Sequence, residues 1–135
     1  MTAATSSCVV DTSALIAIAL VEEAADALTA KLLLASRRYI GAPSVLEAQI
    51  VLAQRAPNAP ASAVIDLLTV LAIEEVEFTQ TMREHAHTAW RTFGKGRHPA
   101  ALNYGDCMSY GVAKAMALPL LYIGNDFSRT DIREV

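Results

Sequence analysis

The fold is decided by the stretch Cys8-Val9-Val10-Asp11-Thr12-Ser13-Ala14-Leu15-Ile16. Its first residues are apolar and favour a strand, because β-branched side chains pack well on a pleated surface. The hydroxyl residues Thr12 and Ser13 suit the N-cap of a helix. We therefore predict a buried strand over residues 8–10 that ends at Asp11, and a helix over residues 12–20.

The same alternation of strand and helix patterns continues along the chain. Short apolar runs predict further strands over residues 37–41, 72–78, 118–123 and 132–135. The strand at 72–78 is expected near a sheet edge. Helical periodicity is found between these strands, over residues 22–35, 43–54, 61–71, 79–93 and 105–117. This alternation predicts an α/β fold, a three-layer α/β/α sandwich with a mainly parallel central sheet. Ligands of such folds bind beyond the carboxyl ends of the strands, near a topological switch point.

Composition bounds the class of protein. The 135 residues are 53% hydrophobic, which favours a single domain over residues 1–135 with a short tail at residues 1–7. The net charge of −3 argues against a broad basic surface for nucleic acid but leaves a local basic patch open. Two cysteines without a metal-binding spacing favour a cytoplasmic protein. The apolar run at residues 8–21 is interrupted by polar residues and is too short to span a membrane.

Acidic residues stand at junctions between predicted elements. Asp11 follows the first strand, Asp106 opens a helix and Asp126 follows the apolar run at 118–123, while Glu47 lies one turn into its helix. Carboxylates brought together repel one another, and a divalent cation removes that repulsion. Oxygen ligands alone favour Mg²⁺ or Mn²⁺ over zinc, and such ions activate water against phosphodiesters. An acid of this kind, taken singly, is more often a helix cap or a solvated residue than a metal ligand.

Four motifs stand in order along nearly the whole chain. They are Val9-Val10-Asp11-Thr12-Ser13-Ala14-Leu15, Ser44-Val45-Leu46-Glu47, Asn103-Tyr104-Gly105-Asp106-Cys107 and Pro119-Leu120-Leu121-Tyr122-Ile123-Gly124-Asn125-Asp126-Phe127. Together they resemble the PIN-domain ribonucleases and, more narrowly, the VapC toxins of bacterial VapBC toxin–antitoxin pairs. The resemblance implies a PIN-like fold, Mg²⁺-dependent cleavage of RNA in which Mn²⁺ can substitute, a cognate VapB antitoxin and a homodimer.

The resemblance also assigns the site. It makes a catalytic and metal-binding quartet of Asp11, Glu47, Asp106 and Asp126. Ser13 would position a metal-bound water or a substrate phosphate. The fourth strand departs from the Thr-x-Asp pattern of many relatives, since Gly124 and Asn125 precede Asp126. Asp131 is therefore kept as an alternative fourth acid.

A basic loop precedes the Asp106 motif, and its glycines would allow close approach to a phosphate backbone. We expect Lys95 and Arg97, together with Ser13 and Asn103, to contact the RNA without reading its sequence. An ordinary solvated loop is the alternative. The aromatic residues Trp90 and Tyr104 are expected to pack in the core or to cover the site.

Two other functions stay open from the sequence. One is a catalytically silent PIN-like module that binds RNA or protein. The other is an aspartyl phosphatase with Asp11 as nucleophile, although that class resembles Asp-x-Asp-x-Thr and Ser13 breaks the pattern. A serine hydrolase is not expected, because Ser44 and Ser109 lack the GxSxG elbow. Cys107 is expected to be a buried structural thiol.

Overall fold

The computed structural model describes residues 7–135, so all but one residue of the expected tail at 1–7 lies outside the described residues. Within this range the strands form one parallel sheet in the order β3-β2-β1-β4. The strands are β1 (Cys8–Val10), β2 (Arg38–Gly41), β3 (Ile73–Val76) and β4 (Leu120–Leu121). The position of β3 at the edge confirms the sequence-based prediction for this strand.

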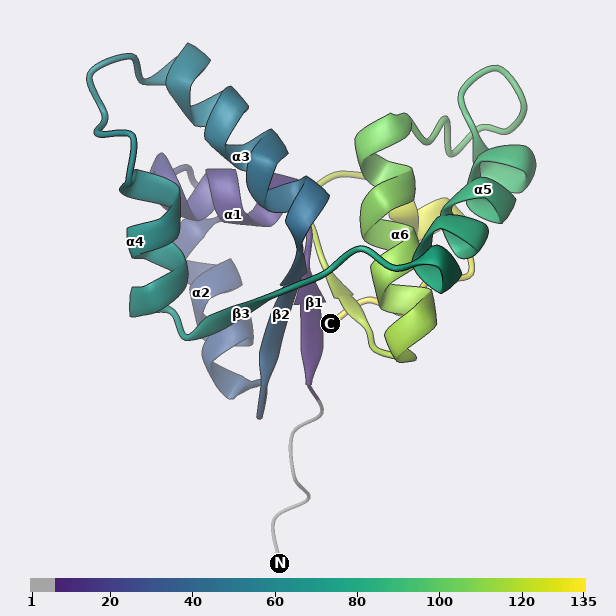
Figure 1. Cartoon of the computed structure of the whole chain (residues 1–135), viewed down its shortest axis with the longest axis horizontal. Coiled ribbons are helices and arrows are strands. Elements are labelled where there is room, and N and C mark those ends of the chain that lie inside the picture. The colour runs from purple at the N-terminus through teal and green to yellow at the C-terminus, as the bar shows by residue number, and fades with distance from the viewer. Residues whose placement is uncertain (1–6) are drawn as a thin grey trace, which may run out of the picture.

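Helices cover both faces of the sheet, as Figure 1 shows, and this confirms the predicted three-layer sandwich. One face is covered by α1 (Thr12–Ala19), α2 (Ala25–Leu34), α3 (Ala42–Arg55) and α4 (Ala63–Val70). The other is covered by α5 (Gln80–Phe93) and α6 (Tyr104–Met116), with a short 3-10 turn at Phe127–Arg129.

The core has two halves that meet at β1. Successive side chains of a strand point to opposite faces, and here Val9 packs with α5 and α6 while Val10 packs with α1 to α4. Both are fully buried. Full burial of one such side chain is worth about 1.5–3 kcal/mol, so the short central strand anchors both layers.

The predicted element bounds differ from the structure mainly at chain ends and caps. The predicted last strand at 132–135 is only a single bridge between Leu120 and Glu134. The predicted helix at 105–117 begins one residue earlier, at Tyr104, because Asn103 provides its cap. The first difference depends on pairing between distant segments and the second on a local side-chain cap, and periodicity reports neither.

The strand order places the switch point between β1 and β4. From β1 the chain proceeds outward through β2 to β3, and β4 then returns to the other side of β1. The carboxyl ends of β1 and β4 therefore flank the crevice in which open α/β sheets bind ligands. No helix within residues 7–135 is both long and apolar enough to cross a membrane.

Candidate active site

Asp11 lies at the carboxyl end of β1 and caps α1. Its side chain is only 4% exposed, and both carboxylate oxygens accept hydrogen bonds. Oδ2 accepts from the backbone N–H of Ser13 at 3.0 Å and from the Ser13 hydroxyl at 2.5 Å. Oδ1 accepts from the Ser109 hydroxyl at 2.5 Å. All three donors are uncharged, and they offset the cost of removing the carboxylate from water.

Glu47 reaches the same place from the second turn of α3. Its carboxylate lies directly against the backbone of α6, where a Cβ atom on Gly105 would overlap both carboxylate oxygens. Only a residue without a side chain leaves this space open. The glycine before Asp106 thus allows α3 and α6 to bring their two acids to one pocket.

Asp106 and Asn103 cap the start of α6 reciprocally. The Asn103 side chain accepts from the Asp106 N–H at 2.9 Å, and the Asn103 N–H donates to the Asp106 carboxylate at 3.1 Å. Burial, together with the charges of Asp11 and Asp126 and a hydrogen bond to Asp126, raises the pKa of Asp106 from 3.8 to about 7. The Asn103 N–H opposes this rise. Asp106 is therefore crowded by like charges without a compensating cation.

The two rivals for the fourth acid lie in different surroundings. Asp126 stands close enough to Asp106 to act on its pKa through charge and a hydrogen bond. Asp131 instead accepts from the Tyr110 hydroxyl at 2.6 Å and pairs with the Lys114 ammonium at 2.8 Å. Burial acts to raise the pKa of Asp131, but these donors and the Lys114 charge outweigh it and the pKa is lowered. Asp131 is thus occupied by its own partners, and Asp126, although it does not line the pocket of the other three acids, is favoured as the fourth member of the acid group.

A pocket of about 330 Å³ lies at this edge of the sheet. Its lining includes five residues proposed from the sequence: Asp11, Ser13, Glu47, Asn103 and Asp106. Glu22 and Arg55, which sequence reasoning missed, also line it and pair at 3.6 Å. Val51 and Arg55 follow Glu47 at intervals of four residues on α3, and that spacing was the available signal.

Mg²⁺ or Mn²⁺ fits the chemistry of this donor set, because the quartet offers only carboxylate oxygens. Three ion pairs occur within residues 7–135, and they join Arg37 with Glu74, Arg55 with Glu22 and Lys114 with Asp131. None of them involves the quartet. In the same part of the chain no three His, Cys, Asp or Glu side chains are already gathered tightly enough to hold a metal ion. Repulsion between carboxylates opposes such gathering until a cation enters.

The expected RNA-binding loop lies apart from this pocket. Lys95 and Arg97 are exposed. They belong to the loop that follows α5, which lies at the upper right of Figure 1. The Arg97 guanidinium stacks over the Trp90 ring, 4.3 Å from its centre. Neither residue lines the carboxylate pocket. Lys95 and Arg97 could therefore contact a phosphate backbone only outside the carboxylate pocket.

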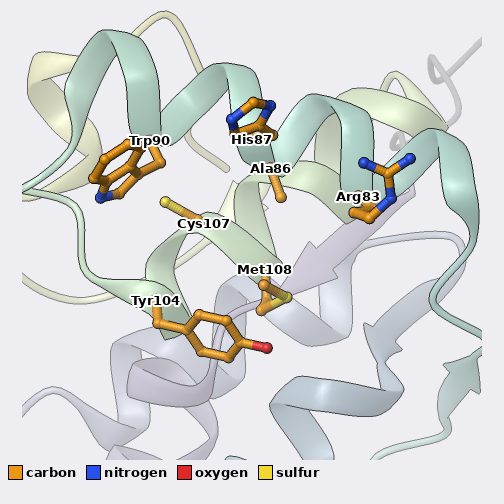
Figure 2. Close-up of a pocket in the computed structure, with 7 residues that line it drawn as sticks. All are labelled: Arg83, Ala86, His87, Trp90, Tyr104, Cys107 and Met108. Carbon is orange, nitrogen blue, oxygen red and sulfur yellow. The ribbon is translucent and has the colours of Figure 1, made fainter.

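A second pocket, of about 340 Å³, lies between α5 and the start of α6 (Figure 2). Trp90 and Tyr104 flank it and are 40% and 79% exposed, so neither packs in the core. Tyr104 also lines a further pocket together with Glu47, so it borders one of the four acids. The expectation of core packing was wrong for both residues, whereas that of covering the site is wrong only for Trp90, which lines neither pocket that contains one of these acids and points toward this mostly apolar hollow. Cys107 is buried beneath it, as expected.

Comparisons with known proteins find relatives over nearly the whole chain. Residues 8–133 match the model of the PIN domain family. Ribonuclease VapC30 of Mycobacterium tuberculosis is 41% identical over 128 residues, which cover 94% of this chain and 97% of that protein. Ribonuclease VapC28 of the same organism is 43% identical over 132 residues, covering 93% and 95% of the two chains.

Solved structures share the fold. One is the crystal structure of Mycobacterium tuberculosis VapC20, described as a sarcin-ricin loop cleaving toxin. It superposes with a TM-score of 0.69 at 20% identity, and the match covers 95% of this chain and 98% of that chain. A toxin–antitoxin complex from Klebsiella pneumoniae superposes with a TM-score of 0.67 at 16% identity, covering 92% of each chain. At these identities the likeness concerns the fold alone.

Proposed function

The chain belongs to the PIN-domain family and, within it, to the VapC ribonuclease toxins of toxin–antitoxin systems, and we propose that it hydrolyses RNA phosphodiesters at the carboxylate pocket. One observation carries the proposal. Asp11, Glu47 and Asp106 come from three separate elements and line one pocket at the switch point of the sheet. Asp126 joins them through Asp106.

The quartet would hold one or two Mg²⁺ or Mn²⁺ ions. A bound ion of this kind would activate water for attack on phosphorus and stabilise the negative charge on the leaving oxygen. Asp11 is held in place by donors on both of its oxygens. The missing side chain at Gly105 leaves room for the Glu47 carboxylate beside the start of α6, and Glu47 and Asp106 line the same pocket. The acids therefore enter the pocket already oriented.

Ser13 is proposed to orient Asp11. Its hydroxyl donates to Asp11 and accepts from the N–H of Ile123 at 3.1 Å, which links the ends of β1 and β4. Arg55 at the rim of the pocket, with Lys95 and Arg97 farther out, would contact phosphates of the RNA. Asn103 borders the pocket, and its side-chain oxygen is engaged in the cap of α6.

The test is cleavage of a single-stranded RNA by purified protein with Mn²⁺ or Mg²⁺, with and without EDTA. Wild type should cut with metal and stop with EDTA. Asp126→Asn should lose most of its activity, whereas Asp131→Asn should keep it, since Asp131 is paired with Lys114. Loss of activity in Asp131→Asn with activity kept in Asp126→Asn would reassign the fourth acid to Asp131. No cleavage by wild type would favour the silent RNA- or protein-binding module, and a phosphoaspartate on Asp11 would favour the phosphatase.

We also propose the partners that the family implies, a cognate VapB-type antitoxin and a second copy of the chain. Large apolar side chains are exposed around two adjoining pockets on α3, α5 and α6: Leu46, Ile50, Trp90 and Tyr104. Monomers rarely expose such contiguous apolar surface. Ile50→Glu should shift a dimer toward monomer in light scattering, whereas Val70→Glu on exposed α4 should not. A wild-type monomer that dimerises only with antitoxin would assign this surface to the antitoxin.

A further inference from the structure

A buried pair of serines lies directly beneath the acid group. Ser44 and Ser109 are 2% and 1% exposed, and their hydroxyl oxygens are 3.2 Å apart. Ser109 also donates to Oδ1 of Asp11. Neither serine is a member of the acid quartet, and neither belongs to a nucleophile motif.

The direction of the hydrogen bonds follows from counting protons. A hydroxyl has one proton to donate, and Ser109 donates its proton to Asp11. The contact between the two serines must therefore run from Ser44 to Ser109. The result is a chain of donors, Ser44 to Ser109 to Asp11, in which each bond polarises the next.

The chain joins the three elements that supply the first three acids. Ser44 precedes Glu47 by three residues on α3, and Ser109 follows Asp106 by three residues on α6. Residues three apart lie on the same side of a helix, so each helix carries one acid and, one turn deeper, one serine. The Ser44 carbonyl also accepts from the Thr12 hydroxyl at 3.2 Å, which ties α1 to the same point.

We propose that Ser109, supported by Ser44, is a positioning residue that sets the carboxylate of Asp11 for metal binding. This inference rests on the proposed function of the site. Two carboxylate oxygens offer about four acceptor positions, and three are taken by Ser13 and Ser109. One acceptor position remains on Oδ1 for a metal ion, and the hydrogen bond from the Ser109 hydroxyl to the same oxygen sets the direction in which this position points. Outer partners of this kind typically change metal affinity by about 10- to 100-fold.

The test is Mn²⁺ affinity, measured by electron paramagnetic resonance of the free ion, alongside thermal unfolding of the metal-free protein. Ser109→Ala should weaken Mn²⁺ binding by about 10- to 100-fold, Ser44→Ala by less, and the double variant no more than Ser109→Ala alone. Ser62→Ala is the matched control, because its exposed hydroxyl also donates to an aspartate, at 2.9 Å, on α4. It should leave Mn²⁺ affinity unchanged.

A purely structural role would lower the unfolding temperature of Ser109→Ala without changing its Mn²⁺ affinity, and that result overturns the inference. If Ser109→Ala does not fold, Ser109→Cys carries the test, since it keeps the volume and weakens the donor. Unchanged affinity in Ser109→Cys overturns the inference as well. Absence of Mn²⁺ binding by wild type overturns the proposed function together with this inference, whereas tight binding by wild type and both serine variants overturns the positioning role alone.

Discussion

Asp11 and Asp131 show two ways in which this protein accommodates an aspartate. Asp131 lies beside α6, accepts from the Tyr110 hydroxyl and pairs with the Lys114 ammonium. Asp11 accepts only from uncharged donors, and its neighbour Asp106 is crowded by further carboxylates. The Lys114 ammonium balances the charge of Asp131, so Asp131 is a structural aspartate. Asp11 belongs to a group of carboxylates whose charge is left for an ion from solution to balance.

The largest effect expected from this difference is on catalysis. Asp11→Asn keeps the shape of the side chain but removes the charge, so RNA cleavage should fall by more than about 100-fold, since even outer partners of a metal ligand are worth about 10- to 100-fold. Asp131→Asn should cleave RNA at the wild-type rate. Rates under single-turnover conditions with Mn²⁺ provide the measurement. A comparable loss in both variants would remove the distinction between the two aspartates.

Two glycines of α6 sharpen the comparison. Gly105→Ala would displace the Glu47 carboxylate. The Mn²⁺ affinity should therefore drop by about 10-fold, as when other partners of metal ligands are disturbed. The free energy of unfolding should change by less than about 1 kcal/mol. Gly111→Ala instead meets the Met82 carbonyl and the Ala86 side chain of α5. It should lower the unfolding temperature through the contact between the two helices. A Gly105→Ala protein with wild-type Mn²⁺ affinity would contradict the placement of Glu47.

The cation of the structural aspartate gives a smaller effect. Lys114→Met removes the partner of Asp131 and should destabilise the protein by about 1 kcal/mol or less, because the pair is partly exposed. RNA cleavage should be unaffected. Denaturant unfolding measures the first quantity. A change in Mn²⁺ affinity in Lys114→Met would show that Asp131 communicates with the acid group after all.

The pH dependence of stability without metal gives a further contrast between the two aspartates' surroundings. The folded state raises the pKa of Asp106 to about 7, so it binds that proton more tightly than the unfolded chain does. The associated stability is fully present below about pH 4, the unfolded value, and is lost as pH rises toward 7. Asp106→Asn should flatten this part of the curve, measured by urea unfolding, and saturating Mg²⁺ should stabilise the wild type above pH 7. An identical pH profile in Asp106→Asn would contradict the crowding of this carboxyl.

The sequence could predict the three-layer sandwich and the convergence of Asp11, Glu47 and Asp106, because both follow from the order of strands and helices along the chain. Parallel strands bring their carboxyl ends to one edge, so acids at strand ends and helix starts converge there without any knowledge of side-chain packing. Asp11, Glu47 and Asp106 belong to this class, and all line the pocket.

The remaining features depend on distances between side chains far apart in the chain. Ser109 contacts Asp11 across 98 residues and Ser44 across 65. The choice between Asp126 and Asp131 depends on which of them meets Lys114. No periodicity or spacing reports such meetings, and a serine without a catalytic motif gives no signal of its own.

The central claim is that the acid group binds a divalent cation and that the paired aspartate does not take part. Mn²⁺ titration of wild type, Asp11→Asn and Asp131→Asn, followed by electron paramagnetic resonance, tests it most directly. Wild type and Asp131→Asn should bind Mn²⁺ with equal affinity, and binding should be lost in Asp11→Asn. Wild-type affinity in Asp11→Asn, or no binding by wild type, would contradict the claim.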